Sequence, residues 1–277
     1  MFADCHMHMV LDGTDWKKAI ERHAAEPDLV FIRRQLECYR QKGYTYLRDG
    51  GDRWGVGAAA RKIAGEYGIT YRTPLSPLCR QGHYGSFIGT AYENLTHYTK
   101  LVVQQRQAGA DFIKIMISGL MDFQQFGVLT EPSLSPEEIR ELIHIAHEEG
   151  MAVMAHANGA ETVEAAAGAG VESVEHGAYL TQEALAAMEE NGTVWVPTLS
   201  TVGNLLGKGR FPDAQVHKIL ESALENLARY TGLVAPGTDA GAWAVPHGST
   251  TEEALLARAG ITEDRLAAGI RAILEKF

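Results

Sequence analysis

The sequence predicts an α/β protein of the (β/α)8 class, a TIM barrel formed as a single domain over residues 1–277. Short β-rich runs alternate with segments of helical period, and no linker or charge block interrupts them. There are eight such units of about 35 residues each, which suits barrels of roughly 250 residues. An open doubly wound sheet is the alternative. It is the weaker one because no glycine-rich dinucleotide turn follows the first strand.

Each predicted strand is a short run of β-forming residues. Turn residues lie between each such run and the neighbouring helical segment. Such runs favour a pleated surface on which the side chains can pack. The eight strands are expected at residues 2–8, 44–49, 70–78, 111–117, 151–156, 171–176, 193–198 and 232–239.

The clearest helix signals lie in the segment SPEEIRELIHIAHEEG. Ser135 can cap the helix, Pro136 suits its first turn, and Glu138 completes a capping box. An apolar stripe follows at helical spacing, and Gly150 ends the segment. A helix is therefore expected between Ser135 and Gly150.

Composition and charge exclude several classes of function. The chain has 35 acidic and 25 basic residues and a net charge of -10, so its surface repels nucleic acid and anionic membranes. No apolar run approaches the ~18 residues of a membrane span, and the chain opens without a signal-type segment, which predicts a cytoplasmic protein. The three cysteines form no CxxC pair and are expected to be reduced.

Histidines and a carboxylate mark the ends of several predicted strands, where the active site of a barrel lies. His6 and His8 are two residues apart on the first strand and so share one face. His156 ends the fifth strand, His176 ends the sixth, and Asp239 ends the eighth. Four imidazoles and a carboxylate at one rim are typical of a metal site.

Lys114 is expected to point into the barrel. Alternation along the fourth strand turns Ile113, Ile115 and Ile117 toward the helices and Lys114 inward. A buried, unpaired ammonium is costly and tends to lose its proton. The neutral amine can react with carbon dioxide to give a carbamate whose two oxygens bridge two divalent ions. Charge balance favours this, because the carbamate, Asp239 and a bridging hydroxide offset most of the charge of the ions.

Five motifs, in order, resemble a known group of enzymes. DCHMH, ADFIKIMISG, VMAHANG, ESVEHG and PGTDAG are similar to motifs of the amidohydrolase superfamily, specifically its imidazolonepropionase-like and prolidase-like binuclear hydrolases. The resemblance runs from about residue 1 to about residue 260. Relatives usually carry a small β-sandwich, which is expected to be absent here because the chain begins on the first strand. The resemblance implies a role for each of six residues: His6 and His8 as ligands of the more buried ion, carboxylated Lys114 as the bridge, His156 and His176 as ligands of the second ion, and Asp239 as the remaining ligand and proton shuttle.

This ligand set predicts hydrolysis of an amide-type C–N bond in a small molecule such as a dipeptide, an N-acyl amino acid or a cyclic amide, with lactones and esters not excluded. Zinc is the expected ion, although manganese, iron and cobalt tolerate the same ligands. A mononuclear deaminase of the same superfamily and a non-catalytic metal-binding barrel are the alternatives. The sequence leaves the oligomeric state open, a homo-oligomer included.

Substrate contacts are expected from two rim loops. The loop LCRQGHYG follows the third strand and carries Arg80, His83 and Tyr84. Similar GGHG loops in the superfamily contact substrate carboxyl or carbonyl groups, which implies the same role for His83. His247, in the loop after Asp239, is a further candidate.

Other polar residues receive structural interpretations. Arg48 and Asp49 are expected to pair with each other beneath a tight turn. Cys5 points away from the two histidines that flank it, and so should be a buried core thiol. His144 and His147 lie on a helix among glutamates, which predicts a solvated face.

Overall fold

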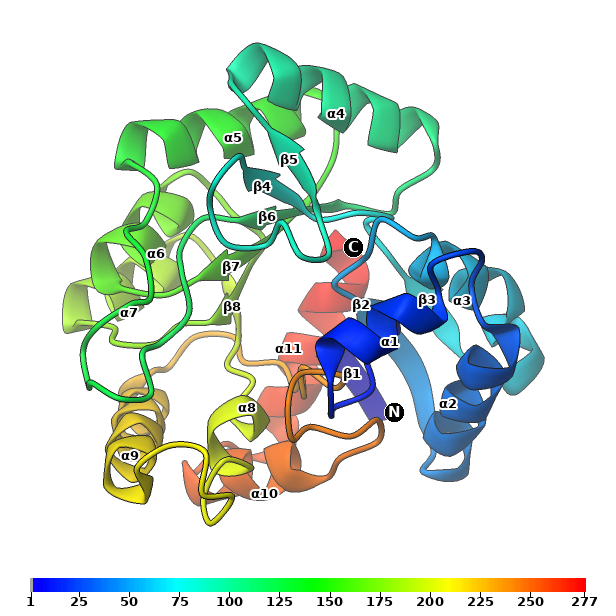
Figure 1. Cartoon of the computed structure of the whole chain (residues 1–277). Helices are drawn as coiled ribbons and strands as arrows, with labels where there is room; N and C mark the ends of the chain where they lie inside the picture. Colours follow the sequence, from blue (N-terminus) through cyan, green and yellow to red (C-terminus); the bar gives the residue numbers. More distant parts are fainter. Residues whose placement is uncertain (1) are drawn as a thin grey trace.

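Parallel strands form the centre of the structure, and helices surround them (Figure 1). The structure is a computed structural model and describes residues 2–277. The strands are β1 (Phe2–Met7), β2 (Tyr44–Asp49), β3 (Thr70–Arg72), β4 (Leu78–Arg80), β5 (Thr90–Tyr92), β6 (Ile113–Met116), β7 (Val153–Ala157), β8 (Ser173–His176) and β9 (Val194–Val196). The α-helices are α1 (Trp16–Arg22), α2 (Leu29–Gln41), α3 (Val56–Ala64), α4 (Leu95–Gln107), α5 (Pro136–Glu148), α6 (Ala160–Gly168), α7 (Gln182–Glu190), α8 (Ser200–Gly203), α9 (Asp213–Arg229), α10 (Thr251–Arg258) and α11 (Glu263–Lys276).

The strands form two parallel sheets, in the orders β1-β2-β3 and β5-β4-β6-β7-β8-β9. The segment predicted as the eighth strand lies between them without forming a regular strand. The Ala235 amide donates to the Trp195 carbonyl of β9 (3.0 Å), and the Cys5 amide of β1 donates to the Pro236 carbonyl (2.8 Å). The barrel class is confirmed, although the regular ladders do not close into one sheet.

The third predicted strand, residues 70–78, is divided in the structure. β3 ends at Arg72, and the proline-containing segment TPLSP precedes β4. Proline has no amide hydrogen to donate to a ladder, which explains the break. Two strands that were not predicted flank the segment with His83: β4 begins the expected rim loop, β5 follows it, and the two strands pair in parallel.

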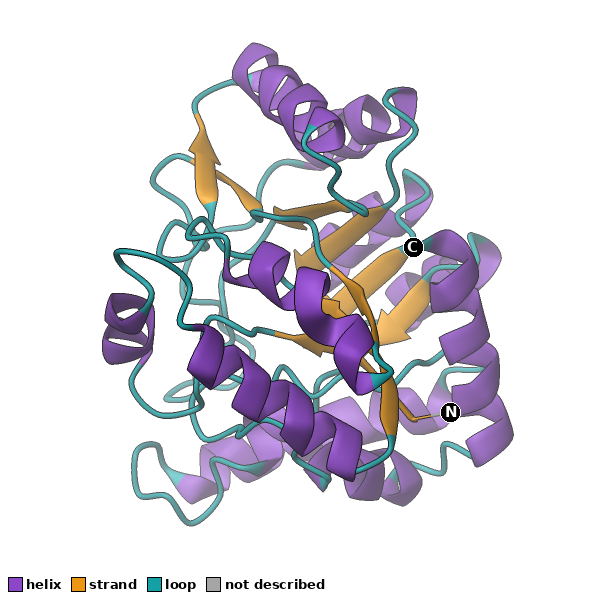
Figure 2. Ribbon diagram, turned by 90° about the vertical axis from the view of Figure 1, so that its right-hand side faces the viewer, coloured by secondary structure: helices purple, strands orange, loops and turns teal. Residues whose placement is uncertain are grey.

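The side chains of β6 divide between the two faces as predicted. Ile113, Ile115 and Ile117 are buried in the large core cluster that the helices cover, and Lys114 is buried on the inner side. Cys5 packs with Ile273 of α11 in a smaller cluster. This helix lies behind the strands at the centre of the ring (Figure 1). Long connecting loops gather on the side opposite the N-terminus (Figure 2).

The predicted helix after Ser135 is α5. The Ser135 hydroxyl accepts from the Glu138 amide at 3.2 Å, and Pro136 occupies the first turn. The expected reciprocal bond of the capping box is replaced, because the Glu138 carboxylate accepts from Arg80 (2.5 Å) and Tyr92 (3.1 Å) instead. Among residues 2–277, the structure contains no helix long and apolar enough to cross a membrane.

Candidate metal centre

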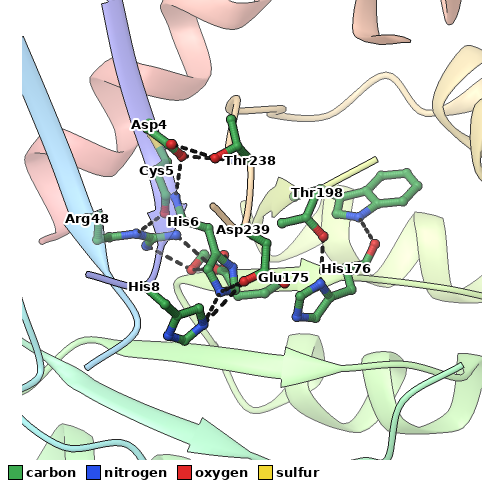
Figure 3. Close-up of polar contacts among 12 residues, drawn as sticks. Asp4, Cys5, His6, His8, Arg48, Glu175, His176, Thr198, Thr238 and Asp239 are labelled. Carbon is green, nitrogen blue, oxygen red and sulfur yellow. Dashed lines mark hydrogen bonds and ion pairs between the residues drawn. The ribbon is translucent and has the colours of Figure 1, made fainter. Parts of the chain in front are cut away.

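Three buried side chains, those of His6, His8 and Asp239, converge at the C-terminal end of β1 (Figure 3). The Nε2 atoms of His6 and His8 lie 3.3 Å apart, and they lie 3.5 Å and 3.3 Å from Oδ1 of Asp239. Donors on a tetrahedral ion with bonds of about 2.0–2.1 Å lie roughly 3.3–3.4 Å from one another. The spacing of these three atoms therefore fits a metal ion.

Several buried atoms without a hydrogen-bond partner in the described part of the chain, residues 2–277, support the same interpretation. They include Nδ1 of His8, Nζ of Lys114 and Oδ1 of Asp239. A buried polar atom without a partner is costly. A bound cation would compensate for the unpaired oxygen of Asp239, and carboxylation of Lys114 would remove its unpaired amine.

Local backbone geometry brings Asp239 and His176 into the site. Asp239 has φ +54° and His176 has φ +69°, both in the left-handed region. His176 follows Glu175, which is itself buried on β8 and contacts His6, so strict alternation would turn His176 away. Its positive φ ends the strand and redirects the side chain. Trp195 holds this turn, because its indole N–H donates to the His176 carbonyl at 3.0 Å.

Gly50 makes room for His8. A Cβ atom at Gly50 would lie 2.2 Å from Cε1 of the His8 ring. No other residue type fits there without moving that ring. The requirement could be suspected from the two consecutive glycines after β2, but the identity of the neighbour comes only from the fold.

Glu175 is a functional residue that the sequence analysis missed. Its Oε2 lies 2.7 Å from Nδ1 of His6, and its Oε1 accepts from Arg48 (2.9 Å) and Ser173 (2.5 Å). Burial raises the pKa of Glu175, but Arg48 and His6 oppose it and hold the value at about 2. The carboxylate therefore fixes Nδ1 of His6 and leaves Nε2 free for the site. Ser173 and Glu175 are two residues apart on β8 and so share one face. This pair of polar residues in a strand was the signal that could have indicated a role for Glu175.

The expected pairing of Arg48 with Asp49 is wrong. Arg48 instead pairs with Glu175. Asp49 accepts from the Met9 amide (3.2 Å) and the Thr73 hydroxyl (3.1 Å). Adjacent residues of a strand face opposite sides, and this separates the two side chains.

His156 and His176 lie beside the convergent group. Their ring centroids are 4.5 Å apart, and the His176 ring lies 5.1 Å from that of His6. Nδ1 of His176 contacts the Thr198 hydroxyl at 2.6 Å, and Nε2 of His156 lies 3.2 Å from the Gly119 carbonyl. These contacts leave the other ring nitrogen of each side chain available.

Burial keeps the imidazoles neutral. It lowers the pKa of His6 to about 4 and that of His156 to about 3, and the Lys114 ammonium adds to both shifts. Burial also lowers the pKa of Lys114 to about 8, against the attraction of Glu175. Neutral imidazole is the form that binds a metal, and a neutral amine is the form that reacts with carbon dioxide.

The six predicted ligands line one cavity of about 790 Å³. Tyr84 also lines it, with its ring centroid 4.8 Å from that of His156. The remaining wall is largely apolar and aromatic. The lining includes His6, His8, Lys114, His156, His176 and Asp239, together with Trp16, Phe87, Phe123, Phe211 and Trp243.

Three predicted substrate contacts lie outside the cavity lining. Arg80 is exposed and pairs with Glu138, because β4 directs it toward α5. His83 is half-buried, and its Nδ1 lies 3.5 Å from Glu131. His247 is a buried structural residue, with its ring nitrogens 3.2 Å from the Tyr39 hydroxyl and 2.9 Å from the Leu11 carbonyl. His144 is exposed and His147 is half-buried, as the helix pattern predicts.

Sequence comparison decides the family. The sequence model of the amidohydrolase family matches residues 59–246, more than half of the chain. The chain belongs to the amidohydrolase family. Members of this family generally use divalent metal ions, which agrees with the geometry of His6, His8 and Asp239.

Individual amidohydrolases are similar over most of the chain. Ochratoxinase of Aspergillus niger is 27% identical over 302 residues, covering 94% of this chain and 61% of that protein. An uncharacterized protein of Mycobacterium tuberculosis is 30% identical over 200 residues, covering 67% of this chain and 52% of that protein. The chain thus spans between half and two thirds of the length of these relatives.

Solved structures show the same fold. A Xaa-Pro dipeptidase with bound methionine has a TM-score of 0.76 at 22% identity, over 99% of this chain and 75% of that one. The structure of A. niger ochratoxinase has a TM-score of 0.73 at 23% identity, over 98% of this chain and 68% of that one.

Proposed function

We propose that this protein is a metal-dependent hydrolase that cleaves an amide-type C–N bond in a small molecule. The convergence of His6, His8 and Asp239 at ligand spacing in a large cavity carries the proposal. The names of the related ochratoxinase and Xaa-Pro dipeptidase support it, since both are hydrolases in this fold.

The side chains divide between two ion positions in this proposal. His6, His8 and Asp239 would hold the first ion, and His156 and His176 would hold the second. Lys114, carboxylated on Nζ, would be the ligand that the two ions share. When bound, divalent ions, with zinc as the expected one, would supply polarisation of the scissile carbonyl and a lowered pKa for a water molecule.

Asp239 acts as the proton shuttle. Burial raises its pKa, but His6, His8 and Lys114 outweigh this effect and hold the pKa below its usual value. The side chain is therefore a carboxylate near pH 7. It can accept a proton from the attacking water and pass it to the leaving amine.

Carboxylation of Lys114 rests on its surroundings. Nζ is fully buried and has no hydrogen-bond partner among residues 2–277, and its pKa of about 8 leaves a neutral fraction near pH 7. The neutral amine adds to carbon dioxide, forming an N–C bond and releasing one proton. The product carries a negative charge, which suits a position between two cations.

A substrate screen tests the activity. The metal-loaded chain is assayed on dipeptides, N-acyl amino acids, lactones and cyclic imides, and is assayed again after chelation and after metal is restored. We expect hydrolysis of at least one amide that chelation abolishes and metal restores. An inactive metal-loaded chain across the whole screen contradicts the proposal and favours a binding protein.

A mononuclear deaminase is the second candidate. Among residues 2–277, only His6, His8 and Asp239 form a group of three or more His, Cys, Asp or Glu donors within 4.8 Å of one another. This grouping is compatible with a single ion. Two metal equivalents per chain and a carbon dioxide adduct on Lys114 support the binuclear hydrolase. One equivalent without the adduct, together with ammonia release from amidine-like substrates, supports the deaminase.

A further inference from the structure

Aromatic rings on separate loops form much of the cavity wall. Phe123 lies in the loop after β6, Phe211 lies before α9, and Trp243 lies before α10. The ring centroids of Phe123 and Phe211 are 5.0 Å apart. The cavity volume of about 790 Å³ lies in the upper part of the range of roughly 300–1,000 Å³ that small-molecule sites occupy. This wall suits a bulky apolar group on the substrate.

Arg210 is placed on this aromatic wall. Its Cζ lies 4.5 Å from the ring centroid of Trp243 and 5.3 Å from that of Phe211, and all three residues line the cavity. The Arg210 side chain is exposed, so it lies at the solvent-facing end. A guanidinium that stacks by its face keeps the N–H groups along its edge free for a planar anion.

The other cavity charges leave Arg210 without a partner. Asp15 caps α1, and Asp122 accepts from the Gln124 amide at 2.7 Å. Asp239 belongs to the proposed metal site. Over residues 2–277, Arg210 forms neither a salt bridge nor a side-chain hydrogen bond, unlike Arg80, which is paired with Glu138.

We propose that Arg210 is a specificity-determining residue that binds an anionic group, a carboxylate, on an amide substrate whose apolar part packs against the aromatic wall. This inference rests on the proposed function for the position of the scissile bond. A bidentate guanidinium–carboxylate contact is charge-assisted and directional. Its loss is expected to weaken binding about 10- to 100-fold.

Paired amides test the inference on the metal-loaded chain. The first series contains naphthoyl amides of glycine, γ-aminobutyrate and ε-aminocaproate. Each acid is compared with a neutral counterpart, the naphthoyl amide of the same amine without its carboxylate. A reverse series carries the carboxylate on the acyl side. KM and kcat are measured for the wild type, Arg210→Gln and Arg210→Lys. Lys17→Gln is the matched control, because Lys17 also lines the cavity and lies 5.5 Å over the Trp16 ring.

We expect at least one carboxylate amide to show a KM about tenfold or more below that of its neutral counterpart. Arg210→Gln should remove this preference by raising KM for the acid, and Arg210→Lys should restore part of it. Lys17→Gln should change the preference for acids less than Arg210→Gln does. A wild type with no preference for either series of acids overturns the inference. An equal rise in KM for acid and neutral amides in Arg210→Gln also overturns it. So does a preference for acids that Lys17→Gln removes.

Calorimetry separates this inference from the proposed function. If the chain cleaves no amide, the affinities of the same acid and neutral compounds are compared in the wild type and in Arg210→Gln. A preference for acids that requires Arg210 supports the inference even though the proposed reaction fails. Equal affinities overturn it.

Discussion

Oε2 of Glu175 lies 2.7 Å from Nδ1 of His6, and both side chains are buried. The two residues are 169 positions apart in the sequence, and their contact joins β1 to β8. The contact sets the orientation of the imidazole, so that Nε2 points toward His8 and Asp239. This orientation is the basis of the first prediction.

Glu175→Gln should weaken metal binding about 10- to 100-fold, because an amide holds the His6 ring less firmly than a carboxylate does. Competition with a chelator measures the affinity. Circular dichroism of the metal-free variant checks that the loss does not come from unfolding, since removing the charge also leaves Arg48 without its ionic partner. Unchanged metal affinity in a folded variant would show that Glu175 has no orienting role.

Gly50→Ala should reduce metal affinity and activity, because its Cβ would lie 2.2 Å from the His8 ring. Gly65→Ala is the matched control. Gly65 has φ -59°, and a Cβ there would meet nothing within 4 Å. The control should be unchanged or more stable by about 0.4–1 kcal/mol. Metal titration and thermal unfolding of both variants provide the test, and equal metal affinity in the two would contradict it.

Asp239→Asn should lower kcat by about 1,000-fold or more while the chain keeps much of its metal, since the amide retains an oxygen donor but cannot accept a proton. Metal analysis and steady-state kinetics on the same sample measure the two effects. Substantial turnover by the metal-loaded variant would exclude Asp239 as the proton shuttle.

Glu252 should make stability depend on pH. The Glu252 carboxyl group is fully buried, and its Oε2 accepts from the Ser200 amide (2.7 Å) and hydroxyl (2.9 Å). Burial raises its pKa from 4.5 to about 8, and the hydrogen bonds oppose the shift only in part. Between these two pH values the unfolded chain has already ionised this group while the folded chain retains the proton. The contribution of Glu252 is therefore full below about pH 4.5 and is lost as the pH rises to about 8.

The comparison with Glu252→Gln isolates this effect. The unfolding free energy of the wild type minus that of the variant should fall by roughly 5 kcal/mol at most between these pH values. Urea unfolding at several pH values measures the difference, with exposed Glu275→Gln as the surface control. A pH-independent difference would mean that Glu252 is already ionised in the folded chain at low pH.

Much of the site could be predicted from strand periodicity. Alternation along β1, continued to the next residue, places His6 and His8 on one face, and alternation along β6 places Lys114 inside. Both are short-range properties of an extended chain, so they need no knowledge of distant residues. The position of Asp239 at the end of a strand-like segment follows from the same reasoning.

Contacts between distant segments could not be predicted in this way. Glu175 and His6 are 169 positions apart, and no local pattern connects them. His83 and His247 follow strand-like segments as rim residues do, yet they lie outside the cavity lining. His83 instead lies beside Glu131, and the His247 ring contacts Tyr39 and the Leu11 carbonyl. Arg210 lies on no motif and reaches the cavity only through the packing of its loop on Trp243.

The amino-acid sequence by itself determined the barrel class, the amidohydrolase family and the inward set of metal-ligand candidates, because periodicity and local motifs act over a few residues. Only the tertiary structure decided which carboxylate contacts His6, how the left-handed φ of His176 turns its own side chain inward, and which loop side chains face the cavity. Those outcomes depend on burial and close packing between segments far apart in the chain, where the neighbours of a residue are set by the whole fold.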